Sequence, residues 1–285
     1  MYAVAGVSGR TGAATAEALL KQGQKVRVLL HDAAKAEPWL KRHAEVAVVD
    51  LSDEAALTKA LTGMAGAYLL LPSDPHAADL LAAHGALTEH LARAVRASGI
   101  KSLVFLSSVG AQHPAGTGPV VALHRAEKAL KGATPSVTFL RASFFLENWA
   151  ASFMTALETG ELRFFGATHL KFPQICAHDI GEAAAAALVA SAPGTRVIEL
   201  AGKENWSPED VAAVLHSVLE TPVKAVALPV EQAHETLLAQ GLSEDRAKLW
   251  AEMYQGLARG QLAFAHPHQL QRGSTTLYDA LRPLF

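Results

Sequence analysis

The chain has 285 residues, half of which are hydrophobic, with a formal net charge of −2 and an isoelectric point near 6.7. Because neither sign of charge dominates, the composition excludes a surface built to bind polyanions, and we expect no direct contact with nucleic acid. Cys176 is the single cysteine, which excludes an intramolecular disulfide and indicates a reducing compartment. No uncharged apolar run approaches the length of a membrane span, so we expect a cytoplasmic protein that does not contact membranes.

Short apolar runs alternate with amphipathic segments through the first part of the chain, a pattern that predicts a parallel sheet with helices on both faces. The expected strands are Tyr2–Ala5, Lys25–Leu30, Glu45–Val49, Ala67–Leu71, Ser102–Leu106 and Ser136–Leu140, with a further candidate at Arg196–Leu200. The expected helices lie near Thr11–Gln22, Glu54–Leu61, Ala77–Ala97 and Arg125–Lys131.

The alternation changes in two later segments. A Pro/Gly-rich loop over Gly110–Pro119 is longer than most connections, which makes it a candidate functional segment. Beyond Phe144 the alternation weakens, and from Pro208 the pattern is mainly helical. We therefore expect an α/β fold in which a doubly wound parallel sheet is followed by a small, mostly helical C-terminal domain.

Three glycines at three-residue spacing, Gly6, Gly9 and Gly12, separate the first expected strand from the first expected helix. In a dinucleotide-binding loop, glycines allow a tight turn, a close approach of the pyrophosphate and close packing of helix on strand. The spacing is not that of the usual GxGxxG fingerprint, and an ordinary turn is the alternative. The strand before and the helix after favour the dinucleotide loop. The expected contacts are Gly6, Ser8, Gly9, Arg10, Thr11 and Gly12.

The residues after the second expected strand bear on the choice between NADP(H) and NAD(H). A 2′-phosphate requires a cation, and His31 and Lys35 lie there, with Arg10 in the glycine loop. Asp32 favours the alternatives, either as an acceptor for the ribose of NAD(H) or as the cap of a solvated turn. We expect NADP(H), with NAD(H) as the alternative cofactor.

Two further strand ends are expected to contact the cofactor, because ligands of open α/β sheets lie beyond the carboxyl ends of the strands. Asp50 and Leu51 follow the third strand, where a carboxylate and an apolar side chain can meet the adenine. Leu71 and Pro72 end the fourth strand, where a backbone bend can lie against the ribose.

Six segments carry a family resemblance through their order and spacing over residues 1–200. They are Gly6-Val-Ser-Gly-Arg-Thr-Gly12, Asp50-Leu51, Leu106-Ser-Ser-Val-Gly-Ala111, Glu127-Lys-Ala-Leu130, Leu140-Arg-Ala-Ser-Phe-Phe-Leu-Glu-Asn-Trp149 and Ala177-His-Asp-Ile-Gly-Glu-Ala183. Together they resemble the NmrA-like branch of the atypical short-chain dehydrogenase/reductases. The resemblance implies a Rossmann domain that binds NADP(H), with Ser107 as a further cofactor contact.

On this resemblance we expect residues 1–149 and 177–200 to form the NAD(P)-binding domain, and residues 150–176 and 201–285 to form a smaller domain for the substrate or a partner. The family includes NADPH:quinone oxidoreductases, and the expected function is hydride transfer from NADPH to a quinone or a similar flat, small-molecule electron acceptor. It also includes proteins without turnover, so the alternative is a non-catalytic NADP(H)-binding regulator that senses redox state through a protein partner. A homodimer is compatible with either function.

Carbonyl reduction in the wider superfamily uses a Tyr and a Lys four residues later, and this chain has no such pair. The family pattern places Pro119 at the Tyr position and Leu123 at the Lys position. Ser108 falls at the family's active-site hydroxyl position, where it would orient the substrate or the nicotinamide ribose. Quinone reduction is less demanding, because the reduced oxygen is far less basic than an alkoxide, and His124 is the expected proton donor. An exposed histidine at a helix start is the alternative interpretation of His124.

Aromatic residues after the sixth strand, Phe144, Phe145 and Trp149, offer flat apolar surface to an acceptor. Packing between two domains is the alternative, which we favour for Trp149. Asn148 would donate to a substrate carbonyl or cap a helix that begins near Trp149. The thirteen histidines form no HExxH motif and pair with no cysteine, so no metal site is expected. The glycine loop lacks the GK[ST] ending of a nucleoside triphosphatase, and Ser8 lacks the GxSxG pattern of an α/β-hydrolase.

Overall fold

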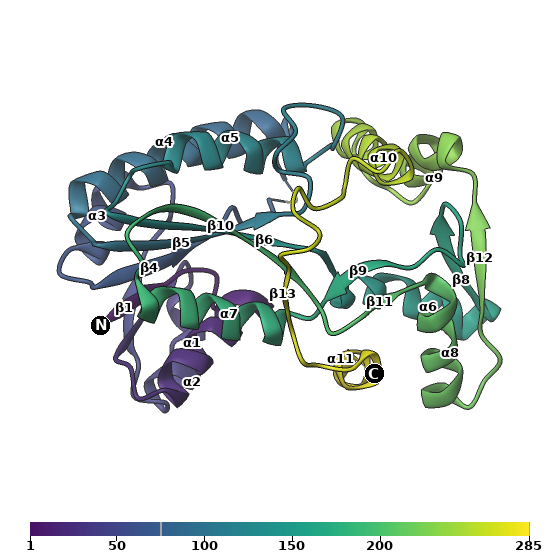
Figure 1. Cartoon of the computed structure of the whole chain (residues 1–285), viewed down its shortest axis with the longest axis horizontal. Coiled ribbons are helices and arrows are strands. Elements are labelled where there is room, and N and C mark those ends of the chain that lie inside the picture. The colour runs from purple at the N-terminus through teal and green to yellow at the C-terminus, as the bar shows by residue number, and fades with distance from the viewer. Residues whose placement is uncertain (75, 285) are drawn as a thin grey trace. The chain divides into compact units, whose positions relative to one another are not determined.

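A computed structural model describes residues 1–74 and 76–284 of the chain (Figure 1). The chain divides into two compact units. Unit 1 comprises Met1–Ser108, Ala122–Arg141 and Ile180–Ile198, and unit 2 comprises Val109–Val121, Ala142–Asp179 and the chain from Glu199 onward. The expected division into domains differs from these units at residues 109–121, 142–149, 177–179 and 199–200. The assignment of the cofactor to one part and the substrate to the other stays a prediction.

Unit 1 is built on a mostly parallel sheet whose strand order is β10-β6-β5-β4-β1-β2-β3. Its strands are β1 (Tyr2–Val4), β2 (Val26–Leu30), β3 (Glu45–Val48), β4 (Gly66–Leu69), β5 (Ser102–Ser108), β6 (Ser136–Ala142) and β10 (Gly194–Ala201). Because β1 pairs in parallel with both β2 and β4, the direction in which the chain builds the sheet reverses beside β1. This is the order of a doubly wound Rossmann sheet, which confirms the expected fold.

Helices cover both faces of this sheet. They are α1 (Arg10–Lys21), α2 (Glu37–Leu40), α3 (Glu54–Leu61), α4 (Leu80–Ser98), α5 (Val120–Leu130) and α7 (Ala177–Ala190). In Figure 1, α3, α4 and α5 lie on one face, and α1 and α7 lie on the other. The core on the first face includes Leu57, Leu91, Phe105, Leu130 and Phe139. The central strands β1, β2, β4, β5 and β6 are largely buried and rich in apolar residues, which is why they can be predicted, whereas β3 is more exposed.

The structure confirms the strands expected in unit 1 to within two residues at each end. Two helices begin elsewhere. α4 begins at Leu80 rather than Ala77, because Asp79 caps it by accepting a hydrogen bond from Ala82 N–H at 2.8 Å. α5 begins at Val120 rather than Arg125, since the first residues of the helix bury apolar side chains.

Unit 2 contains more strands than expected, because the sequence predicted a mostly helical domain. Its helices are α6 (Ala150–Thr159), α8 (Pro208–Leu219), α9 (Ala233–Ala239), α10 (Glu244–Ala258) and α11 (Leu277–Leu281). Its strands are β7 (Phe144–Phe145), β8 (Glu161–Phe165), β9 (Phe172–Ile175), β11 (Asn205–Trp206), β12 (Lys224–Leu228) and β13 (Gln271–Arg272). β11, β9 and β7 form one sheet, β12 pairs with β8, and β13 pairs with the last residues of β10. Strands of two residues are too short for an alternating pattern to reveal them.

Two apolar clusters form the core of unit 2. One gathers Leu146 and Trp149, which precede α6, with Leu215 of α8 and further side chains of α6, α8 and α11. The other includes Leu237 of α9 and Ala247 of α10. Within the part of the chain that the structure describes, no helix combines the length and the apolar character needed to cross a membrane.

Candidate functional site

The turn between β1 and α1 requires glycine at two positions, whereas a third glycine has open space around it. Gly6 lies in the left-handed region at φ 70°, and a Cβ there would come within 2.7 Å of Leu70 Cδ2. A Cβ on Gly12 would overlap the carbonyl oxygens of Ala5 and Gly6, so Gly12 packs α1 directly on the end of β1. At Gly9, by contrast, the closest described atom to a Cβ is Gly6 O at 3.4 Å. Gly9 is also exposed, so it presents open backbone.

The N-terminus of α1 offers a binding site for an anion. Gly9 is its N-cap, no described side chain caps it, and its first turn holds no acidic residue. The first N–H groups of a helix lack intrahelical acceptors and form the positive end of the helix dipole. Ser8 and Arg10 are exposed beside them, whereas Thr11 is buried. Because β1 lies where the strand order reverses, these residues match the requirements of a dinucleotide pyrophosphate.

α7 packs against α1 at Gly181. A Cβ on Gly181 would come 2.5 Å from Ala14 Cβ, which is closer than side chains approach one another. Gly181 was not among the expected site residues, although it lies in a segment that carries the family resemblance. Its role is to let α7 touch the helix whose N-terminus forms the anion site.

The residues that follow β2 and β3 lie close together. His31 Nε2 is 3.8 Å from Asp50 Oδ2, and both side chains are exposed. The N–H and the hydroxyl of Ser52 both donate to Asp50 Oδ1, at 2.8 Å. These two bonds, together with the nearby His31, hold the pKa of Asp50 below its usual value. His31 and an ionised Asp50 therefore lie side by side at this edge of the sheet.

Three further residues after β2 and β3 bear on the expected cofactor site, namely Asp32, Lys35 and Leu51. Asp32 accepts a hydrogen bond from Ala34 N–H at 2.9 Å, which confirms the capping interpretation of Asp32. Lys35 is exposed at the end of the short turn that Asp32 caps. Leu51 is half-buried against the core of unit 1. Lys35 is thus accessible to a ligand, while Leu51 offers an apolar edge.

The expected ribose contacts lie beyond β4 rather than within it, because the strand ends at Leu69. Leu71 is half-buried against the core, and Pro72 is exposed. His84 of α4 donates a hydrogen bond through Nε2 to Pro72 O at 3.0 Å, since a carbonyl oxygen can only accept. The loop after β4 is therefore held on α4.

A buried network joins three elements at the end of β5. Glu127 of α5 accepts two hydrogen bonds from Arg141 of β6, from Nε at 2.9 Å and from Nη2 at 2.6 Å. Ser107 of β5 donates to the same carboxylate at 2.6 Å. The Ser107 hydroxyl is thus directed at Glu127, and its contact with a cofactor stays a prediction. Glu127 and Arg141 were not among the expected site residues, because a separation of 14 residues hides their pairing in the sequence.

The two expected catalytic residues both lie in unit 1. Ser108 is the last residue of β5 and is half-buried. His124 lies inside α5, half-buried, one turn before Glu127. His124 is therefore not an exposed histidine at a helix start, which was the alternative interpretation of this residue. The catalytic roles of Ser108 and His124 stay predictions.

The expected functional loop, Gly110–Pro119, contains no helix or strand, as predicted. In unit 2 it packs on α10. Gly116 N–H donates to Glu252 Oε1 at 2.8 Å, and a Cβ on Gly118 would overlap Leu249 O. These glycines serve close packing of backbone on helix, and a direct role of the loop in function stays a prediction.

The aromatic residues expected to meet a substrate belong to a ring cluster in unit 2. The centroid of Phe144 lies 5.7 Å from that of Trp149 and 5.6 Å from that of Phe172. Trp149 is 3% exposed and donates through Nε1 to Gln174 Oε1 at 2.7 Å, so it is a core residue. Phe144 and Phe145 are only half-buried.

Two alternatives for this segment are revised by the structure. Trp149 does pack in a core, but its partners belong to unit 2 itself. Asn148 is exposed, and no described side chain caps α6, whose N-cap is Trp149. A capping role for Asn148 is therefore not supported, and its contact with a substrate stays a prediction.

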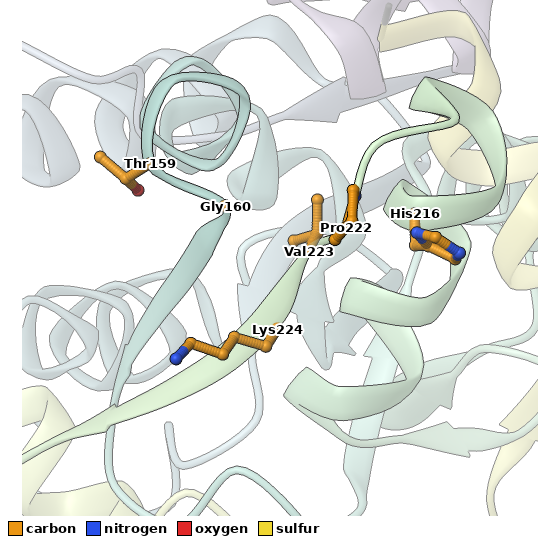
Figure 2. A pocket seen from close by; sticks show the side chains of 6 residues that line it. All are labelled: Thr159, Gly160, His216, Pro222, Val223 and Lys224. Atoms are coloured by element: carbon orange, nitrogen blue, oxygen red, sulfur yellow. The ribbon is translucent and has the colours of Figure 1, made fainter.

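A hollow of about 480 Å³ opens on unit 2 away from these residues (Figure 2). It is lined by Thr159, Gly160, His216, Pro222, Val223 and Lys224. Figure 2 shows that the side chains of His216 and Lys224 extend in different directions, so they do not converge on one ligand. His216 Nδ1 also lies 3.0 Å from Thr221 O, within hydrogen-bonding distance. None of the expected site residues lines this hollow.

Cys176 is buried, as a small apolar residue would be. Burial raises the pKa of its thiol, which disfavours the reactive thiolate. Among residues 1–74 and 76–284, no three His, Cys, Asp or Glu side chains are placed to hold a metal ion.

The model of the NmrA-like family matches residues 2–258. The NAD(P)H azoreductase of Xenophilus azovorans is 27% identical over 257 residues, which cover 89% of this chain and 86% of the relative. Quinone oxidoreductase 2 of Escherichia coli strain K12 is 28% identical over 300 residues, which cover 100% of this chain and 99% of the relative.

Solved structures of other reductases have a similar fold. The NADPH-dependent quinone oxidoreductase of Escherichia coli, complexed with NADPH, has a TM-score of 0.83 and 26% identity, with both chains covered in full at 100%. The triphenylmethane reductase of Citrobacter sp., complexed with NADP(H), has a TM-score of 0.82 at 20% identity, with both chains covered at 100%, and supports the fold alone.

Proposed function

Because the chain belongs to the NmrA-like family, we propose that it is an NADPH-dependent oxidoreductase that transfers hydride to a quinone or a similar flat electron acceptor. The observation that carries the proposal is the uncapped N-terminus of α1, preceded by the glycine turn where the strand order reverses. The azoreductase and quinone oxidoreductase relatives support a reductase. The related structure that holds NADPH supports this cofactor.

Unit 1 supplies the proposed cofactor contacts. Backbone N–H groups in the first turn of α1 bind the pyrophosphate. The Gly9 N–H itself donates to Gly6 O at 2.9 Å, so Gly9 contributes open backbone that the ligand can approach. Lys35 and Arg10 supply positive charge for the 2′-phosphate of NADPH, and His31 supplies a ring N–H donor. When bound, the reduced nicotinamide supplies the hydride. The full proposed set is Gly6, Ser8, Gly9, Arg10, Thr11, Gly12, His31, Lys35, Asp50, Leu51, Leu71, Pro72 and Ser107.

The proton that completes the reduction comes from the chain or from solvent. A reduced quinone oxygen is far less basic than an alkoxide, so one protonated imidazole, which becomes neutral as it gives up its proton, is sufficient. His124 is that donor in our proposal, and Ser108 orients the acceptor. Burial raises the pKa of both Tyr68 and Tyr254, so neither phenol is a good proton donor.

The acceptor meets apolar surface from the segment after β6. Phe144 and Phe145 offer half-buried rings, which favour a flat conjugated molecule over a flexible aliphatic one. Trp149 supports Phe144 from within the core of unit 2, and Asn148 offers an amide to a carbonyl oxygen.

The proposal is tested by supplying the purified protein with NADPH and a panel of quinones and azo dyes. Oxidation of NADPH that requires both the protein and an acceptor supports it. NADPH binding without turnover on any acceptor contradicts it and favours the redox-sensing regulator.

A further inference from the structure

The Glu127–Arg141 pair is a buried ion pair that the proposed chemistry does not use. The exposed fraction of each side chain is 10%, and the pair is bidentate, with Nη2 2.6 Å from Oε2 and Nε 2.9 Å from Oε1. Ser107 donates a third hydrogen bond to Glu127 Oε1 at 2.6 Å. These three hydrogen bonds converge on one carboxylate, so the position of that carboxylate is fixed from β5 and from β6 at once.

Stability alone is a weak reason for such a pair. Removing two charges from water is costly, and apolar residues of similar volume often pack as well or better. Apolar packing of α5 on the sheet is already provided by Ala126 and Leu130, which lie in one core cluster with Phe139 of β6. The ion pair instead fixes the orientation of α5, because a bidentate contact sets both the rotation of the helix about its axis and its position along that axis.

The network adjoins the two proposed catalytic residues in sequence and within unit 1. Ser107 immediately precedes Ser108 on β5, and Glu127 follows His124 by three residues on α5. Residues three apart on a helix lie on neighbouring parts of its surface. A rotation of α5 that moved Glu127 would therefore move His124 as well, whereas the hydrogen bond from Ser107 ties Glu127 to the strand that carries Ser108.

We propose that Glu127 and Arg141 are positioning residues, which fix α5 against the ends of β5 and β6 so that His124 and Ser108 keep a constant geometry for the reduction. The inference rests on the proposed function, because it assigns those two residues to the reaction. The network acts through them and does not itself touch the acceptor.

The test replaces the ion pair by neutral side chains of similar size in the double variant Glu127→Gln/Arg141→Met. Replacing both partners avoids a lone buried charge, and the amide oxygen introduced at position 127 can still accept from Ser107. We expect kcat for quinone reduction to fall by roughly ten- to a hundredfold, since a displacement of about 1 Å has such an effect. The dissociation constant of NADPH and the KM of the quinone should stay within about twofold of wild type.

A matched control makes the same change at the opposite ends of the strands. Arg27 of β2 donates through Nε to Glu45 of β3 at 2.8 Å, and the two side chains are 18% and 45% exposed, so this pair is less buried than Glu127–Arg141. The variant Arg27→Met/Glu45→Gln should lower the melting temperature but leave kcat within about twofold. Ser107→Ala, which leaves the ion pair intact, is a second test variant and should lower kcat severalfold. An unchanged dissociation constant of NADPH in this variant separates the effect from the proposed cofactor contact of Ser107.

Two results would overturn the inference. One is a folded double variant, or a folded Ser107→Ala protein, that reduces quinones at the wild-type rate. The other is a loss of kcat in the control that equals the loss in the double variant, because the network would then contribute stability only. Failure of the proposed function is a separate result, since the wild-type protein itself would then oxidise no NADPH.

Discussion

Gly12 of α1 lies directly against Gly6 of the preceding turn, so close that a Cβ on Gly12 would overlap the Gly6 carbonyl oxygen. At Gly9, between them, a Cβ would meet Gly6 O only at 3.4 Å. Two glycines of the loop are therefore needed by the fold itself. The third is needed only if a ligand approaches the backbone.

This difference predicts opposite outcomes for two substitutions. Gly9→Val should abolish NADPH binding and leave the melting temperature nearly unchanged, because the added side chain meets the ligand and not the core. Gly12→Ala should lower the free energy of unfolding by roughly 1–3 kcal/mol, because α1 must shift away from β1. Titration with NADPH and thermal unfolding check both variants. Wild-type affinity in Gly9→Val would contradict the assignment of the loop.

The cations at the end of β2 predict the choice of cofactor. NADP(H) should bind more tightly than NAD(H) by roughly 1–2 kcal/mol, if one or two charge-assisted hydrogen bonds reach the 2′-phosphate. His31→Ala and Lys35→Ala should each weaken NADP(H) binding and leave NAD(H) binding unchanged. Lys41→Ala is the control, because Lys41 is an exposed lysine that pairs with Glu37 on α2. Equal affinities for the two cofactors in the wild-type protein would show that these cations do not contact the phosphate.

His124→Ala tests the source of the proton. If the imidazole donates it, quinone turnover should fall by up to roughly a hundredfold while the KM for NADPH is unchanged. The matched control is His216→Ala, since His216 lies in the hollow of unit 2 (Figure 2). A wild-type rate in His124→Ala would mean that solvent protonates the product.

Cys176 should be inert in the folded protein. The residue is 3% exposed and burial raises the pKa of its thiol, so little thiolate forms near neutral pH and reagents cannot reach it. Labelling with a thiol reagent should be slow in the native state and complete after unfolding in denaturant, which serves as the control. Rapid labelling of the native protein would show that the segment around Cys176 opens readily.

The central strands β1, β2, β4, β5 and β6 of unit 1 could be predicted because they are largely buried and rich in apolar residues. The ends of the helices were harder to predict. Val120 and Val121 begin α5 although β-branched residues have low helix propensity, because burial of their side chains outweighs that preference. In unit 2, β7 and β11 have two residues each, and such strands exist only through their pairing with β9.

The candidate site was predictable where local sequence determines it. The glycine turn and the cap at Asp32 follow from neighbouring residues, and the structure has both. The Glu127–Arg141 pair depends on α5 folding back against β6, which no local pattern reveals. The packing of Gly181 on α1 likewise joins segments that are far apart in the chain.

We propose that this chain reduces flat acceptors without a Tyr–Lys pair, and a comparison of three acceptor conditions tests this proposal. Initial rates of NADPH oxidation are compared for a quinone, a simple ketone and no acceptor, at one protein concentration. We expect a protein-dependent rate with the quinone and no rate above background with the ketone, because the sequence has no Tyr–Lys pair to protonate an alkoxide. Efficient reduction of the ketone, or no oxidation with any quinone, would contradict it.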